Sequence, residues 1–227
     1  MEFETRFIKS LEVINRKSAV CTVSGGLDSA VSAAMMINAG FETRFIFFDW
    51  GQKTFRREFE CATKLAEYYK TDLKVVEVAI LKSLPGISLT QAETLTLPIN
   101  EYVPNRNAIL ESQAVAYAEF MRAGAVCIGS TGGDHICPDN SPAFVGVMQK
   151  LVDQGTMLNP PIKMIAPLMD TDKTGAVEIG QRLNVPFELT WSCHNNIDKA
   201  CGKCSNCETR IEAFQLNGLK DPIEYEK

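Results

Sequence analysis

The sequence predicts an α/β protein: a parallel sheet with helices on both faces, followed by a C-terminal motif of four cysteines. Two observations predict the sheet. Short apolar segments rich in β-branched and aromatic residues alternate with longer segments of helical periodicity, and a pair of glycines stands where the first apolar segment meets the first helix. The third observation is that four of the eight cysteines lie between residues 193 and 207.

Four segments have the length and composition of buried parallel strands, at Ser18–Val23, Thr43–Phe48, Leu73–Val78 and Ala125–Gly129. Helices are expected at Ser29–Asn38, Phe55–Tyr69, Ala108–Met121 and Thr174–Leu183. Alternation of the two kinds of element implies a parallel sheet covered on both faces. Two long connections, Ala79–Asn107 and Ser130–Pro142, leave the carboxyl side of predicted strands, where open α/β sheets bind ligands.

Composition limits the class of protein. The 227 residues are 45% hydrophobic, which is enough for one large domain with its own core. The net charge of −5 provides no general footprint for nucleic acid. Because no apolar run is long enough to span a bilayer and the N-terminus has no secretory pattern, we expect a cytoplasmic protein without a membrane partner.

The glycine pair belongs to a loop that suits phosphate, made of Ser24, Gly25, Gly26, Leu27, Asp28 and Ser29. Adjacent glycines let backbone N–H groups approach an anion, and the start of the following helix adds partial positive charge. The serine hydroxyls are further donors, and Asp28 offers a carboxylate to Mg²⁺. The loop lacks the ending of a Walker loop and the spacing of a dinucleotide fold. The alternative is an ordinary strand-to-helix turn.

The clustered cysteines are Cys193, Cys201, Cys204 and Cys207. Overlapping Cys-x-x-Cys turns predict tetrahedral coordination of one zinc ion, and four sulfur ligands would make that zinc structural, with no open position for water. An iron–sulfur cluster is the chemical rival, and four buried thiols without metal are the third alternative. We interpret His194 as a residue beside the metal or at the surface. The expected division is a nucleotide-binding domain at 1–190 and a zinc-binding segment at 191–227 packed on it.

The loop at 24–29 closely matches the pyrophosphate loop of the N-type ATP pyrophosphatases. Together with the cysteine spacing it resembles the 7-cyano-7-deazaguanine synthase family of queuosine and archaeosine biosynthesis. Further matches follow the family's order, at Trp50-Gly51-Gln52, Tyr102-Val103-Pro104-Asn105-Arg106-Asn107, Pro167-Leu168 with Lys173, and Trp191-Ser192-Cys193.

This resemblance implies a Rossmann-like fold of the adenine nucleotide alpha hydrolase type. It also implies an ATP-dependent ligase that converts 7-carboxy-7-deazaguanine to a nitrile through an amide. Two ATP and ammonia would be used, the AMP-forming route being favoured, with Mg²⁺ and structural Zn²⁺ as cofactors and a homodimer as the assembly.

Roles for single residues follow from the same resemblance. Catalysis is assigned to Asp28, Ser29, Arg106 and Lys173; ATP binding to residues 24–29 and Gln52; substrate binding to Trp50, Arg106, Asn107, Asp134 and Asp139. Asn107 is also expected to cap the following helix. Each has a plainer alternative: a surface ion pair for Arg106, a solvated helix position for Lys173, a loop position for Gln52 and the core for Trp50.

One segment departs from the family pattern. Where the family has Tyr-Pro-Asp-Cys-Arg, this chain has Cys137-Pro138-Asp139-Asn140-Ser141, without the aromatic ring and the arginine. We therefore expect weak activity on the family's usual acid. Two rival functions remain at this point: an ATP pyrophosphatase acting on a different acid, amide or tRNA base, and a non-enzymatic zinc-ribbon module that binds a partner.

Overall fold

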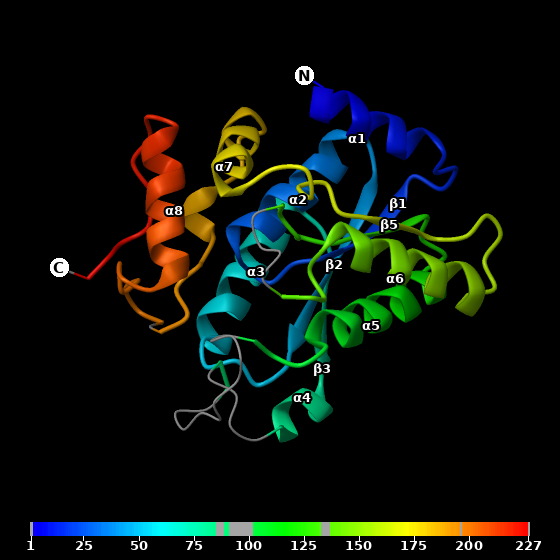
Figure 1. The fold of residues 1–227 in the computed structure, drawn as a ribbon, viewed down its shortest axis with the longest axis horizontal. Coiled ribbons are helices and arrows are strands. Elements are labelled where there is room, and N and C mark those ends of the chain that lie inside the picture. Colours follow the sequence, from blue (N-terminus) through cyan, green and yellow to red (C-terminus); the bar gives the residue numbers. More distant parts are fainter. Residues whose placement is uncertain (1, 85–88, 91–101, 133–136, 196, 227) are drawn as a thin grey trace.

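The computed structural model describes residues 2–84, 89–90, 102–132, 137–195 and 197–226. One sheet of five parallel strands has the order β3-β2-β1-β4-β5 (Figure 1). The strands are β1 (Ser18–Thr22), β2 (Glu42–Asp49), β3 (Leu73–Glu77), β4 (Ala125–Cys127) and β5 (Lys163–Ile165). The four predicted strands are confirmed, whereas β5 was not predicted.

The helices are α1 (Glu2–Glu12), α2 (Leu27–Asn38), α3 (Phe55–Tyr69), α4 (Ala79–Ser83), α5 (Arg106–Phe120), α6 (Pro142–Gly155), α7 (Lys173–Arg182) and α8 (Ser205–Leu216), with a 3-10 turn at Phe187–Leu189. The helices α2, α3, α5 and α7 correspond to the four that the sequence predicts. The helices α1, α4, α6 and α8 were not predicted.

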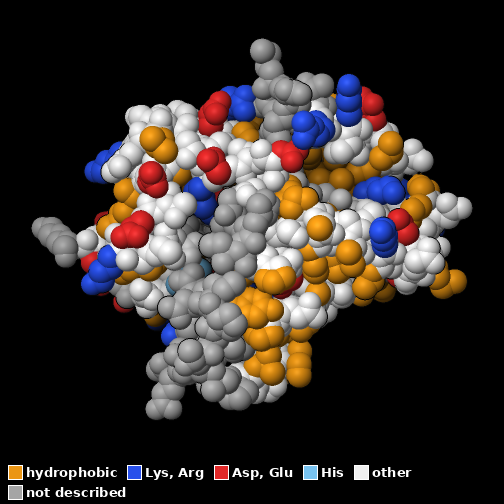
Figure 2. Space-filling view, in the orientation of Figure 1, with side chains coloured by type: hydrophobic (Ala, Val, Ile, Leu, Met, Phe, Trp, Pro, Cys, Tyr) orange, Lys and Arg blue, Asp and Glu red, His pale blue; other side chains and the backbone are white. Residues whose placement is uncertain are grey.

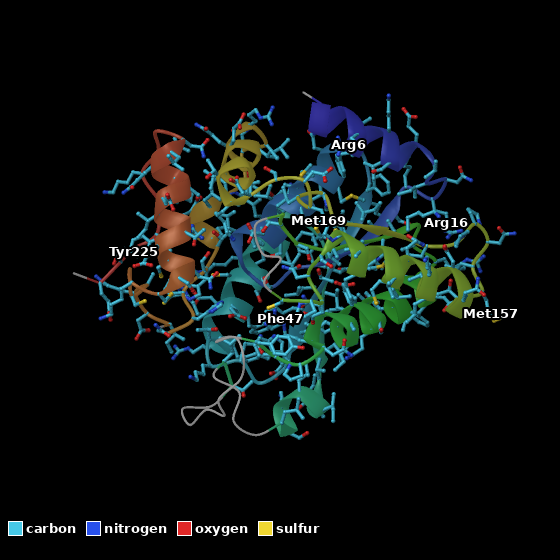
Figure 3. All side chains as sticks on the ribbon, in the orientation of Figure 1. Arg6, Arg16, Phe47, Met157, Met169 and Tyr225 are labelled. Carbon is cyan, nitrogen blue, oxygen red and sulfur yellow. The ribbon has the colours of Figure 1, made fainter. Side chains whose placement is uncertain are left out.

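Side chains of β2 show how both faces of the sheet are covered. Phe45 and Phe47 are buried in a cluster with side chains of α1, α2, α3, α7 and α8. Ile46 and Phe48 point the other way, into a second cluster with side chains of α4, α5 and α6. Figure 3 places Phe47 near the middle of the molecule. Because both faces of β2 are buried over Phe45–Phe48, this stretch is continuously apolar, which is the signal that predicted the strand.

Strand order fixes where a ligand can enter. The chain runs outward from β1 through β2 to β3, then returns to form β4 on the other side of β1. The connections therefore leave in opposite directions at β1, and open α/β sheets bind ligands at the carboxyl ends of strands beside such a switch. The loop at residues 24–29 begins there, at the end of β1.

Buried Arg210 joins the C-terminal segment to the rest of the molecule. Its guanidinium is 0% exposed and donates from Nε to Asp221 Oδ2 at 2.7 Å. It also donates to Thr190 Oγ1 at 2.8 Å and to the Phe187 carbonyl at 3.1 Å. An edge-to-face contact between Phe187 and Phe214, with centroids 5.1 Å apart, adds apolar contact. The division at residue 190 stays a prediction.

A bilayer-spanning helix would need both length and apolarity, and no helix in the described part of the chain has both.

Candidate active site and metal centre

The loop at residues 24–29 is folded tightly against α3. Gly25 has φ +80°, and a Cβ there would lie 2.3 Å from the carbonyl oxygen of Glu58. Both the backbone conformation and the close approach therefore require glycine. The Ser29 hydroxyl donates to the Gly26 carbonyl at 3.0 Å and accepts from the Ser24 N–H at 3.2 Å. The two serine hydroxyls lie 3.2 Å apart. The loop is thus preorganised around its own hydroxyl groups at the start of α2.

Asp28 and Lys173 form an ion pair across the site, from the first turn of α2 to the first residue of α7. Both side chains are mostly buried, at 18% and 13% exposed. Asp28 Oδ1 is buried and has no partner in the described part of the chain. Two residues predicted to be catalytic, 145 positions apart in the sequence, are therefore in direct contact, with one carboxylate oxygen left for a ligand.

The segment Trp50-Gly51-Gln52 forms another wall, but the amide of Gln52 is occupied internally. Its Oε1 accepts from the Trp50 N–H at 3.0 Å, and its Nε2 donates to the Phe48 carbonyl at 3.0 Å and to Glu58 Oε2 at 3.1 Å. Glu58 also accepts from the Thr54 hydroxyl. Gln52 lines the cavity while holding this turn in shape, and its contact with ATP stays a prediction.

The start of α5 brings Arg106 and Asn107 into the site. The Arg106 guanidinium lies 5.1 Å from the centroid of the Trp50 ring, a cation–π contact between two predicted substrate residues. Burial lowers the pKa of Arg106, and the nearby Asp139 carboxylate acts in the opposite direction. The expectation that Asn107 caps this helix is wrong. The cap position is Asn105 and the helix begins at Arg106, so Asn107 lies in the first turn.

Asn107 instead binds the segment that follows β4. Its backbone N–H donates to Asp139 Oδ2 and its side-chain Nδ2 donates to the Asp139 carbonyl, both at 2.8 Å. Asp139 is buried and is not among the described residues that line the cavity, so it positions Asn107 from behind. The predicted substrate residue Asp134 lies outside the described residues.

Glu111, one turn further along α5, also lines the cavity, and sequence reasoning did not identify it. Burial raises the pKa of its carboxyl to about 8, and repulsion by Asp139 acts in the same direction. A glutamate within a helix normally indicates a solvated position. Nothing in the local pattern distinguishes this one, because its burial arises from the packing of α5 on the sheet.

These groups enclose one cavity of about 420 Å³ at the carboxyl ends of β1, β2 and β4. All residues of the loop at 24–29 except Gly25 line it. So do Trp50, Gln52, the start of α5 and Lys173. The cysteine segment contributes Trp191, Ser192, His194 and Asn206. His194 is close to Asn206, with Nδ1 and Nδ2 3.2 Å apart. His194 thus lies on the cavity wall, which the sequence did not specify.

The four cysteines form a compact metal-binding group. Their sulfur atoms all lie within 4.8 Å of one another, and those of Cys201 and Cys207 are 3.9 Å apart. Burial disfavours the Cys201 thiolate, but N–H groups of Lys203 and Cys204 and contacts with neighbouring thiols outweigh it and lower its pKa to about 6. Tetrahedral ligation at Zn–S distances of about 2.3 Å separates sulfurs by ~3.8 Å. The group can therefore hold a single metal ion.

Comparison with known proteins gives a consistent result. Residues 18–218 match the family model described as queuosine biosynthesis protein QueC. The chain is 40% identical over 223 residues to the 7-cyano-7-deazaguanine synthase of Methanoculleus marisnigri, covering 93% of this chain and 100% of the relative. It is 39% identical to the protein of the same name from Oceanobacillus iheyensis, covering 92% and 98%.

Solved structures share the fold at low sequence identity. NMN synthetase from Francisella tularensis aligns with a TM-score of 0.54 and 17% identity, covering 96% of this chain and 84% of that one. The U34-tRNA thiolase NcsA from Methanococcus maripaludis, solved with its [4Fe-4S] cluster, aligns with a TM-score of 0.53 and 17% identity, covering 96% and 71%. These similarities support the predicted nucleotide-binding fold.

Proposed function

The chain belongs to the QueC family of queuosine biosynthesis proteins, and from that premise we propose that it is an ATP-dependent carbon–nitrogen ligase. It converts 7-carboxy-7-deazaguanine into 7-cyano-7-deazaguanine, with ammonia as the nitrogen donor. The observation that carries the proposal is one cavity that joins a phosphate-type loop, the Asp28–Lys173 pair and the start of α5. A partner-binding zinc ribbon would need none of these groups.

The AMP-forming route requires two similar cycles. In the first, a substrate carboxylate oxygen attacks the α phosphorus of ATP and pyrophosphate leaves. Ammonia then attacks the carbonyl carbon, AMP leaves, and loss of a proton gives the amide. In the second cycle the amide oxygen attacks the α phosphorus of another ATP and pyrophosphate leaves. Loss of AMP and of both protons on nitrogen then gives the nitrile. Both cycles place the same charge on the leaving pyrophosphate, so one phosphate site serves twice.

Residues of this chain suit those steps. Backbone N–H groups of the loop at 24–29 bind the leaving phosphates at the start of α2. Lys173 neutralises phosphate charge, while Asp28 keeps its ammonium group in place and offers the free Oδ1 to Mg²⁺. Arg106 and Asn107 orient the acceptor from the opposite wall.

For the cysteine site we propose Zn²⁺, held by Cys193, Cys201, Cys204 and Cys207. The compact spacing of the four sulfurs supports a single ion, since a four-iron cluster is larger and needs its cysteine sulfurs further apart. The ion supplies no chemistry to the reaction, because four thiolates fill its coordination sphere. Its role is to hold the wall formed by Trp191, Ser192, His194 and Asn206.

We further propose that the chain acts in the cytoplasm as a homodimer formed through α5 and α6. Val147 and Leu151, four residues apart on α6, are exposed, as is Phe120 at the end of α5. Met157 extends beyond the end of α6 and is 96% exposed (Figure 3). Figure 2 shows hydrophobic side chains gathered over this side of the molecule. A second copy of the chain would bury these exposed apolar side chains. If it does, Leu151→Lys should convert the dimer to a monomer, which light scattering measures.

Mass spectrometry of the products tests the function. Purified protein is incubated with ATP, Mg²⁺, ammonia and 7-carboxy-7-deazaguanine. We expect the nitrile, with two AMP and two pyrophosphate formed for each nitrile, and no nitrile when ammonia is omitted. A related ATP pyrophosphatase with a different acceptor would leave the acid unchanged, and formation of ADP and phosphate would contradict the proposed route.

A further inference from the structure

Glu111 is a buried carboxyl group in the wall of the cavity. Its side chain is 4% exposed, and Oε2 is enclosed and makes no hydrogen bond within the described part of the chain. Burying such a group unpaired destabilises the folded state. An unsatisfied buried polar atom calls for an explanation, and because Glu111 lines the cavity, a ligand bound there is placed to supply the missing partner.

The surroundings of Glu111 restrict what that ligand can be. The cavity that Glu111 lines is also lined by apolar side chains of one core cluster, among them Phe48, Leu110 and Ile128. Burial raises the pKa of its carboxyl to about 8, and repulsion by Asp139 adds to this. An anionic group such as a phosphate beside it would act in the same direction and hold the carboxyl protonated. A ligand that offers N–H donors satisfies both carboxyl oxygens and favours their ionised form.

We propose that Glu111 is a specificity-determining residue that binds the guanine-like edge of the acceptor. Its two carboxylate oxygens accept hydrogen bonds from the ring N1–H and from the 2-amino group, after rotation about the last side-chain bond turns the enclosed Oε2 toward the cavity. These are two parallel donors in one plane, the pattern that a carboxylate binds in bidentate fashion. The inference rests on the proposed function, because the identity of the acceptor comes from it.

This contact would also orient the reacting group. In 7-carboxy-7-deazaguanine the N1 and 2-amino edge belongs to the six-membered ring, whereas the reacting carboxylate is on the five-membered ring, on the far side of the base. Holding the first edge at Glu111 directs the carboxylate away from α5, toward the loop at 24–29 and Lys173, which line the same cavity. The same residue thus selects the base and positions it for adenylation.

Other ligands of the reaction fit Glu111 less well. The adenine of ATP presents one amino donor beside an unprotonated ring nitrogen, and that nitrogen would repel the second carboxylate oxygen. Ammonium offers donors but no planar pair, and it would leave the apolar walls around Glu111 without contact. The acceptor supplies both the donor pair and an apolar ring.

The test compares two acceptors with wild-type enzyme and with Glu111→Gln. The second acceptor is 7-carboxy-7-deazahypoxanthine, which lacks only the 2-amino group. For wild type, we expect removal of that group to lower kcat/KM by about 10- to 100-fold. In Glu111→Gln, the KM for the acid should rise by a similar factor, with the KM for ATP unchanged, and the two acceptors should become nearly equivalent.

Control variants exclude a general effect on the fold. Glu111→Leu should also lose the discrimination while raising Tm, because it replaces an unpaired carboxyl in apolar surroundings. Glu67→Gln, on the exposed face of α3, should behave as wild type.

The outcomes are separable. Wild type that fails to convert the acid contradicts the proposed function and this inference with it. If wild type converts the acid but Glu111→Gln keeps its efficiency and its discrimination, the inference alone is wrong. A rise in the KM for ATP or for ammonium in place of the acid assigns Glu111 to that ligand and overturns the proposal.

Discussion

Asn107 and Asp139, which belong to different motifs, hold each other by two hydrogen bonds of 2.8 Å. One joins the Asn107 N–H to the Asp139 carboxylate, and the other joins the Asn107 side chain to the Asp139 carbonyl. These two bonds join the start of α5 directly to the described end of the segment after β4. In the segment at 137–141, which departs from the family pattern, this chain keeps the Pro-Asp pair, and the aspartate of that pair positions Asn107.

Replacing Asp139 should disturb binding of the acceptor more than binding of ATP. In Asp139→Ala the N–H of Asn107 loses a charged partner in a buried setting, which should cost about 1–3 kcal/mol of stability. We expect the KM for the acid to rise about 10-fold because Asn107 and Arg106 are displaced. Steady-state kinetics and thermal melting measure both effects.

The matched control is Asp170→Ala, which breaks a surface ion pair with Arg6 of 2.8 Å. Exposed pairs of this kind contribute about 0–1 kcal/mol, so this variant should resemble wild type. Equal behaviour of the two variants would show that the contact between Asn107 and Asp139 has no positioning role.

The sequence predicted the part of the fold that has strong periodic signals. Four strands and four helices were recognised because the strand segments are short and rich in β-branched and aromatic residues and the helices carry apolar residues at helical spacing. The strand β5 was missed because it is only three residues long and follows two prolines. The helix α6 was missed although Phe144, Met148 and Val152 repeat at four-residue spacing and Ser141 offers a cap.

For the site, the sequence predicted which residues take part better than it predicted which of them are in contact. Asp28 and Lys173 were both predicted, but only the structure shows that they pair. Asn107 was assigned to the cap because Asn is common there, yet Asn105 has the left-handed φ of 52° at that position. Glu111 and His194 reach the cavity through tertiary packing, and a single sequence contains no signal for that.

Adenylation should depend on the loop at 24–29 and on its ion pair. We expect Asp28→Ala, Ser29→Ala and Lys173→Ala to lower AMP formation by at least about 100-fold, because positioning and charge stabilisation dominate phosphate chemistry. Each variant should keep the far-UV circular dichroism of wild type. The measurement is AMP release with saturating acid and ammonia.

Lys64→Ala is the control for Lys173→Ala, since it also breaks a Lys–carboxylate pair, to Glu60 at 2.7 Å on the exposed side of α3, and neither residue lines the cavity. It should leave AMP formation unchanged. Near-normal turnover by both Asp28→Ala and Ser29→Ala would contradict the assignment of the loop to ATP.

Elemental analysis of protein purified without chelators should find one zinc per chain. Cys204→Ser should lose the metal, lower Tm, and reduce ligation, because the same loop forms part of the cavity wall. Cys61→Ala is the control, because Cys61 is buried in the same apolar cluster but is not one of the four grouped thiols. Iron with sulfide, or no metal at all, would overturn the zinc proposal.

The ligand-free protein should lose stability as pH rises because of Glu111. Its folded pKa of about 8 lies above the usual value of 4.5. Below about pH 4.5 the carboxyl is protonated whether the chain is folded or unfolded, so it has no effect. Between the two values only the unfolded chain releases the proton, and stability falls by an amount of order a few kcal/mol as pH approaches 8.

Denaturant melts of wild type and Glu111→Gln at pH 5, 6.5 and 8 isolate this effect, because other titrating groups are common to both proteins. The stability of Glu111→Gln relative to wild type should increase over this range and level off above about pH 8. Parallel pH profiles would show that Glu111 titrates normally in the folded protein.

The segment that departs from the family pattern provides the last prediction. Ser141 is the N-cap of α6, and its hydroxyl accepts from the Phe144 N–H at 3.2 Å. Arginine at this position would remove the cap, so Ser141→Arg should cost about 1 kcal/mol of stability.

Cys137 lines the cavity without a ring to stack on a base, so Cys137→Tyr tests the missing aromatic contact. If the departure weakens binding of the acid, as we expect from the sequence, the double variant should lower its KM despite the lost cap. An unchanged KM, together with efficient turnover by wild type, would show that Trp50, Arg106 and Glu111 suffice to bind the acceptor.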